Sequence, residues 1–149
     1  MLLAGLLWGN NMSDFSNFLE KELLDQVLRA EAWVAPSSVW IALFTADNGL
    51  ETNVQIGEVA TGGYTRMEIG GSSGRSFLAA TGSPGATDNA DVVTFPTATA
   101  GWGTITHTAI MSASTAGEVL IHGLLTLPKT VVVDDIVKFA VGDFDISLD

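Results

Sequence analysis

The sequence contains no cysteine among its 149 residues. A disulfide scaffold, a thiolate metal site and a cysteine nucleophile are therefore excluded. Positive charge is also scarce, because six Lys and Arg residues stand against 17 Asp and Glu residues and give a formal net charge of −11. Residues 76–128 contain neither Lys nor Arg. Since proteins bind nucleic acid largely by neutralising its phosphates, we expect no nucleic-acid partner.

Charged residues of either sign and long apolar runs are also few. Charged side chains make up 15% of the chain, whereas 47% of its residues are hydrophobic. This predicts one well-formed core beneath a surface of short, neutral side chains. We interpret the negative charge as a source of solubility, or alternatively as an acidic face that matches a basic partner lattice.

Residues 1–11 (MLLAGLLWGNN) form the most apolar segment of the chain. The segment lacks the basic flank and cleavage site of a secretory signal and is far shorter than the ~20 residues that cross a bilayer, so we expect no membrane partner. Two interpretations stay open. It is an extension from an upstream start, since Met12 begins a plausible protein start, or it is an apolar arm that docks on a neighbouring subunit. We divide the remainder into a helical segment, residues 12–35, and a β-domain, residues 36–149.

Residues 12–35 have the pattern of an amphipathic helix. Ser13 is a good N-cap, Asp14 suits the first turn, and Pro36 follows the expected end. Apolar residues recur at helical spacing, which predicts about five turns with one apolar face. That face packs either on the domain's own sheet or on a partner. The residues we assign to a protein interface are Phe15, Phe18, Leu19, Leu23 and Val27.

After Pro36 the apolar period changes from 3.6 to 2, and the segments become short and rich in Val, Ile, Thr and Phe. We therefore predict a mainly β fold, an antiparallel β-sandwich of jelly-roll type that one amphipathic N-terminal α-helix precedes. The expected strands are residues 39–45, 64–69, 76–80, 92–95, 103–112, 118–127, 130–133, 136–141 and 144–148, with residues 70–74 and 81–89 as loops.

The two histidines, His107 and His122, fall on the two arms of the longest expected hairpin. If its turn is symmetric about Ser114 and Thr115, His107 lies directly across from His122, at about 5 Å between Cβ atoms. A metal-binding or pH-sensitive pair is one interpretation. A hydrogen-bonded structural pair or an interface pair is favoured, because no third metal ligand stands beside either residue.

Other groups of polar and aromatic residues carry no catalytic pattern. The acidic residues near the C-terminus, among them Asp134, Asp135 and Asp143, match neither an EF-hand loop nor a positioned carboxylate pair. A phosphate cradle requires a Gly-rich loop that leads into a helix. We expect no helix directly after the Gly-rich segments at 62–63 and 70–74. Trp33, Trp40 and Trp102 are widely spaced and are expected to pack in the core rather than bind sugar. We therefore predict no catalytic residue, no cofactor, no metal and no enzymatic activity.

Several strings together resemble a known family. These are MSDFSNFLEKELLDQVLR, VAPSSVWIALFTAD, GGYTR, VTFPTATAGWGTITHTAIMSAST and GEVLIHGLLTLPKTVVVDDIVKFAVGDFDISL. From Met12 to Leu148 the chain is similar to small virion structural proteins of tailed bacteriophages, whose members are described as tail-fibre-like or as capsid decoration (cement) proteins.

The resemblance implies a self-associating β-sandwich, plausibly a homotrimer, that binds other virion proteins. The expected function is that of a non-enzymatic cement protein on the capsid surface, assembled in the host cytoplasm, with the major capsid protein as partner. The alternative is a tail fibre or adhesin component that binds host-surface glycans.

Overall fold

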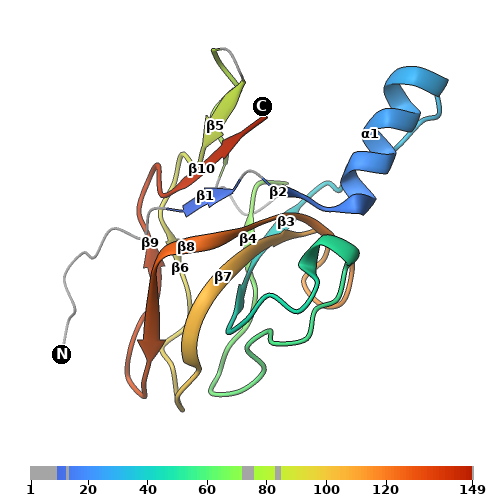
Figure 1. Ribbon diagram of the computed structural model, residues 1–149. Helices are drawn as coiled ribbons and strands as arrows, with labels where there is room; N and C mark the ends of the chain where they lie inside the picture. The colour runs from blue at the N-terminus through green and yellow to red at the C-terminus, as the bar shows by residue number, and fades with distance from the viewer. Residues whose placement is uncertain (1–9, 13, 72–75, 83–84, 149) are drawn as a thin grey trace.

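The computed structural model describes residues 10–12, 14–71, 76–82 and 85–148 (Figure 1). In chain order the elements are β1 (Asn10–Met12), β2 (Asp14–Phe15), α1 (Asn17–Arg29), β3 (Val39–Phe44), the 3₁₀ helix η1 (Leu50–Thr52), β4 (Met67–Ile69), β5 (Ala86–Asp88), β6 (Val93–Thr94), β7 (Gly103–Met111), β8 (Val119–Val131), β9 (Lys138–Phe139) and β10 (Phe144–Ser147).

Most strands belong to one eight-stranded sheet. Its order is β4-β3-β7-β8-β1-β10-β5, with β2 paired to β8 as well, and β6 and β9 form a separate two-stranded sheet. The strand pairs are antiparallel except β1 and β10, which run parallel. The predicted class, mainly β and antiparallel with a helix near the N-terminus, is confirmed. The jelly-roll connectivity stays a prediction.

The large sheet buries apolar residues on both faces. Along β3, Ile41 and Leu43 enter the larger core cluster, whereas Ala42 and Phe44 enter a smaller cluster together with Leu50 of η1. Because successive side chains of a strand point to opposite faces, a strand covered on both sides is apolar throughout. The loop that carries η1 therefore covers the second face of the sheet.

An aromatic chain joins the two-stranded sheet to the large one. Phe139 on β9 lies 4.5 Å from Phe144 on β10 and 6.2 Å from Phe95, measured between ring centroids. Phe95 in turn stacks on Tyr64 and meets Trp102 edge-on. Aromatic packing thus helps to fix the small sheet to the large one.

Two predicted strands, residues 118–127 and 130–133, prove to be one strand. β8 runs without a break through Pro128, and its pairing with β7 shifts in register between Ile105 and His107. Proline has no N–H to donate, and a local irregularity is where a sheet tolerates it. Pro128 lies within this irregular part of the pairing, so the strand continues where the sequence predicted a break.

The structure also differs from expectation near three loops. Residues 10–12 pair with β8 and β10 of their own chain, and residues 86–88, expected in a loop, form β5. The expected strand at 76–80 is reduced to an isolated bridge between Phe77 and Asn89. Both β1 and β5 pair with β10, and local sequence carries little information about a partner so far along the chain. Residues 1–9 lie outside the described part.

The helix is shorter than predicted and begins later. Its N-cap is Ser16, whose hydroxyl accepts from the N–H of Leu19 and donates to the carbonyl of Val119. The predicted cap, Ser13, lies outside the described residues. The helix ends at Arg29, because Ala30 takes the left-handed conformation that commonly closes a helix. Within the described residues, no helix is both long and apolar enough to span a membrane.

Candidate functional site

The predicted interface residues divide into a buried and an exposed group. Leu19 is buried in the larger core cluster, and Phe15, Phe18 and Leu23 pack against that cluster. Val27 is 78% exposed. Four of the five predicted interface residues thus contact the chain's own core, and Val27 remains at the surface.

Val27 has exposed apolar neighbours on the same helix. Leu24 and Leu28 are 59% and 75% exposed, and the three positions follow the i, i+3, i+4 spacing of one helix face. We call Leu24, Val27 and Leu28 the α1 stripe. Figure 1 shows α1 projecting from the β-strands, with its first turn beside β2 and its far end away from the sheets. The stripe therefore presents an apolar surface outside the β-body.

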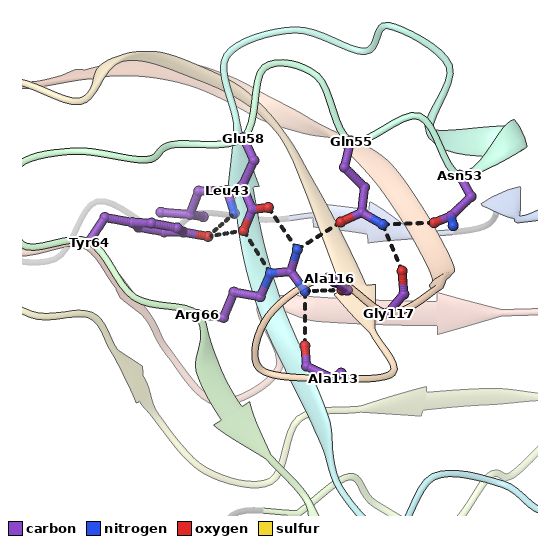
Figure 2. Close-up of polar contacts among 9 residues, drawn as sticks. All are labelled: Leu43, Asn53, Gln55, Glu58, Tyr64, Arg66, Ala113, Ala116 and Gly117. Carbon is purple, nitrogen blue, oxygen red and sulfur yellow. Dashed lines mark hydrogen bonds and ion pairs between the residues drawn. The ribbon is translucent and has the colours of Figure 1, made fainter.

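A second arrangement is a polar network around Arg66, which follows Tyr64 in the GGYTR string (Figure 2). The Arg66 side chain is only 4% exposed, and its Nε and Nη2 donate to the two carboxylate oxygens of Glu58, each at 2.7 Å. Nη2 also donates to Gln55 Oε1, and Nη1 donates to the carbonyls of Ala113 and Ala116. These contacts use all five N–H groups of the guanidinium, which is how a buried cation is accommodated.

Tyr64 completes the network on the side of the core. Its hydroxyl donates to Glu58 Oε1 at 3.1 Å and accepts from the N–H of Leu43 at 3.0 Å. Burial, together with the adjacent Glu58 carboxylate, raises the pKa of the Tyr64 phenol far above its usual value. The phenol is therefore protonated at physiological pH and serves as a hydrogen-bond donor rather than as a base.

The network holds the β7–β8 loop, residues 112–118. Gln55 Nε2 donates to the carbonyl of Gly117 at 2.7 Å and to Asn53 Oδ1 (Figure 2). Asn53 Oδ1 also accepts from the N–H of Val119. Together with Arg66, these side chains fix three carbonyls of an otherwise exposed loop. The Arg66 network holds the β7–β8 loop to the rest of the domain, and its polar atoms contact other groups of the same chain.

Sequence reasoning did not identify this network. Its members come from three separate segments, and Arg66 lies 50 residues from Ala116. The available signal was that Arg66 is one of three arginines in a cation-poor chain, and this does not say which groups it contacts. Only the fold supplies Glu58 and the loop carbonyls.

The two histidines lie on one face of the β7–β8 hairpin but not directly opposite each other. His107 pairs with Leu124, and His122 pairs with Ala109, so the predicted register is wrong by two residues. The cause is the loop, where the N–H of Ser112 reaches the carbonyl of Glu118 and the register shifts after Ile110. A shift of two residues keeps both side chains on one face and places them diagonally.

His122 is buried beneath the η1 loop. Its Nε2 lies 3.3 Å from Glu51 Oε2, and its Nδ1 lies 4.0 Å from Asp47 Oδ2. Asp47 also accepts from the N–H groups of Gly49 and Leu50. Burial disfavours the charged form of Asp47, but the two backbone donors together with the nearby His122 and His107 outweigh it and lower the pKa of the carboxyl. His122 and Asp47 thus tie η1 to the sheet.

We expect His107 to make the stability of the fold sensitive to acid. Partial burial lowers the pKa of its imidazole, and the nearby His122 acts in the same direction against the attraction of Asp47. A histidine whose pKa is lower in the folded than in the unfolded chain stabilises the fold above the unfolded value, near 6.5, and loses that stabilisation as pH falls below it. We expect His107→Gln to lose less stability than the wild type between pH 7 and pH 5, in urea melts at each pH. Parallel curves for the two proteins would contradict this assignment.

Acidic and aromatic residues that were candidate site residues in the sequence make structural contacts in the fold. Asp135 Oδ2 accepts from the N–H of Val132, and Asp143 Oδ2 accepts from that of Ala140. Trp102 is buried in the larger cluster, whereas Trp40 packs against the smaller one on the other face. Within residues 10–12, 14–71, 76–82 and 85–148, no group of three or more His, Cys, Asp and Glu side chains is arranged to hold a metal ion.

Comparison with known proteins identifies the family. A comparison with curated protein sequences finds no match. The family model described as podophage GP4 fiber I protein gp80 matches residues 14–147, which include α1, every strand except β1, and the Arg66 network. Since the match spans nearly the whole chain, this protein belongs to the family of the podophage GP4 fiber I protein gp80, a family of phage virion structural proteins.

Proposed function

We propose that this chain is a non-enzymatic structural subunit of the virion, which decorates the capsid surface and stabilises it by contact with the major capsid protein and with copies of itself. The observation that carries the proposal is the combination of family membership with a rigid β-body that has an exposed apolar helix end. A subunit of a lattice needs a stiff body and a surface outside it that joins neighbours. Many such contacts together resist force although each is weak.

The described polar clusters support a structural function. Arg66, Glu58 and Tyr64 contact one another and the β7–β8 loop, and His122 contacts the η1 loop. A catalytic centre keeps at least one polar group directed at a space for substrate. In both clusters the polar groups are instead engaged with neighbouring parts of the chain.

The alternative placement is a fibre or adhesin component that contacts host-surface glycans. The family description names a fibre protein of one phage, and a trimeric fibre also needs a rigid body and a self-associating segment. In this placement the exposed loops of the β-body would contact the glycan. In the capsid placement α1 and the sheet edges would contact neighbouring subunits.

Copy number separates the two placements. We expect quantitative mass spectrometry of purified virions to give a number of copies comparable with that of the major capsid protein. Antibodies against the chain should then label the head in electron micrographs. A copy number near that of the tail components, with label confined to the tail, would overturn the capsid placement and support the fibre alternative.

A further inference from the structure

The loop that carries η1 contains the only Asn–Gly dipeptide of the sequence, Asn48–Gly49. The side-chain amide carbon of an asparagine is open to attack by the backbone nitrogen of the next residue. Glycine hinders this attack least, because it has no side chain. Asn48 is also exposed, so water reaches its amide. The dipeptide thus has the composition and the exposure of a site of spontaneous deamidation.

The shape of the loop depends on both residues. Gly49 has a φ of +111°, and a Cβ at this position would lie 3.2 Å from Thr52 Oγ1 and 3.3 Å from Val54 Cβ. Any other residue at position 49 is therefore strained. Asn48 Nδ2 donates to the carbonyl of Ile56 at 3.0 Å, and an ionised aspartate has no proton for this bond. The fold thus requires a chemically reactive pair at this place.

The same loop restrains the nitrogen that would attack. The N–H of Gly49 donates to Asp47 Oδ1 at 2.8 Å. This nitrogen reacts only after it loses its proton, and a carboxylate that accepts from the N–H disfavours the resulting anion. Asp47 is itself anchored, because it also accepts from the N–H of Leu50 and lies 4.0 Å from His122. The attacking nitrogen is therefore held by a fixed acceptor.

We propose that Asn48 is a site of spontaneous deamidation and that Asp47 slows the reaction in the folded protein. In this reaction Gly49 N forms a bond to Asn48 Cγ, and the side-chain amino group leaves as ammonia with the proton of the Gly49 N–H. Water then opens the cyclic imide at one of its two carbonyls and leaves aspartate or isoaspartate. No group is oxidised or reduced, and water is the co-reactant.

Deamidation of Asn48 weakens the cover over the second face of the sheet. It replaces the Nδ2 donor with a carboxylate oxygen, so two acceptors meet where Asn48 bonded to the carbonyl of Ile56. The same loop carries Leu50, which is buried with Ala42 and Phe44 in the smaller core cluster. A virion outside its host does not replace its subunits, so the change accumulates with the age of the particle in either placement of this chain.

Peptide mass spectrometry of the stored full-length protein tests the proposal. Trypsin releases residues 30–66 as one peptide, which contains Asn48 and Asn53, and fragment ions distinguish the two. Asn53 is the internal control, because the branched side chain of Val54 hinders attack. In weakly alkaline buffer we expect Asn48 to deamidate slowly in the native wild type and roughly tenfold faster in urea, where the loop loses its hydrogen bonds. Equal rates in the two states, or a faster reaction at Asn53, would rule the proposal out.

Variants of the loop carboxylates test the contribution of Asp47. We expect Asp47→Ala to deamidate at Asn48 roughly tenfold faster than the wild type in the native state and at the same rate in urea. Glu51→Gln is the matched control, because the Glu51 carboxylate also lies near His122 but its bond is to that ring and not to Gly49. Its rate should stay near that of the wild type.

Circular dichroism verifies that these variants fold. Asp47→Asn keeps an oxygen acceptor without its charge and should react at an intermediate rate, so it replaces Asp47→Ala if the alanine variant does not fold. A native rate no higher than that of the wild type in the Asp47 variants contradicts the proposal. The same holds if Glu51→Gln accelerates the reaction equally, because general loosening of the loop would then explain it.

Discussion

Replacing Arg66 with methionine is expected to lower the free energy of unfolding by about 3–5 kcal/mol. The change leaves the half-buried Glu58 carboxylate without its cation and removes the donors to the carbonyls of Ala113 and Ala116. An unpaired buried charge costs more than the pair contributes, and a domain is stable by only about 5–15 kcal/mol. Urea denaturation followed by circular dichroism measures the loss.

Arg29→Met provides the matched control. Arg29 also makes two ion pairs, with Asp25 and Glu31, but its side chain is 62% exposed. Solvent screens such pairs, so we expect little change in the denaturation midpoint. Arg66→Lys should fall between, because a lysine keeps the charge but cannot reach five acceptors with one planar group.

Hydrogen exchange locates the effect of Arg66. In Arg66→Met the amides of the β7–β8 loop, such as that of Glu118, which donates to Ser112 Oγ, should exchange faster than those of β9. A loss of stability in Arg66→Met no greater than in Arg29→Met would show that the network contributes no more than a surface pair.

Replacing Phe139 with alanine is expected to cost about 3–5 kcal/mol, because a fully buried aromatic side chain is removed and the space is only partly refilled. Phe139 contacts Phe95 and Phe144 and so connects the two-stranded sheet to the large one. The ring pairs contribute beyond the area that they bury. Thermal and urea unfolding measure the loss.

Two further variants provide a comparison for the stability loss of Phe139→Ala. Phe139→Leu keeps most of the apolar volume and should cost clearly less than the alanine variant. Val141→Ala changes a residue two positions along that is 57% exposed, and it should be close to neutral. If Phe139→Ala matched Val141→Ala, the aromatic chain would not be what holds β6 and β9 to the body.

The Arg66 network and the packing of Phe139 have a common consequence for assembly. Arg66 fixes the β7–β8 loop, and Phe139 fixes the small sheet, so the β-body resists local opening. The exposed half of α1 has neither kind of support within the described chain. A stiff body with one unsupported apolar projection fits a subunit that completes its packing against neighbours.

Sequence alone determined the features that depend on short-range pattern. The change of apolar period at Pro36 gave a helix followed by strands, because a helix and a strand expose every third or fourth residue and every second residue to one face. The alternation Phe144, Asp145, Ile146 placed two residues in the core and Asp145 in solvent, as the structure shows. The absence of cysteine and the shortage of cations excluded whole classes of chemistry.

Tertiary structure decided which residues meet. The two histidines are displaced by two residues from the expected pairing because the hairpin loop is not symmetric and the register shifts after Ile110. Likewise the helical pattern could not say which part of the apolar face was already covered. Leu19 is buried and Val27 is exposed although both belong to that face. Periodicity assigns a residue to a face, but only the folded chain determines how far along the helix that face is packed.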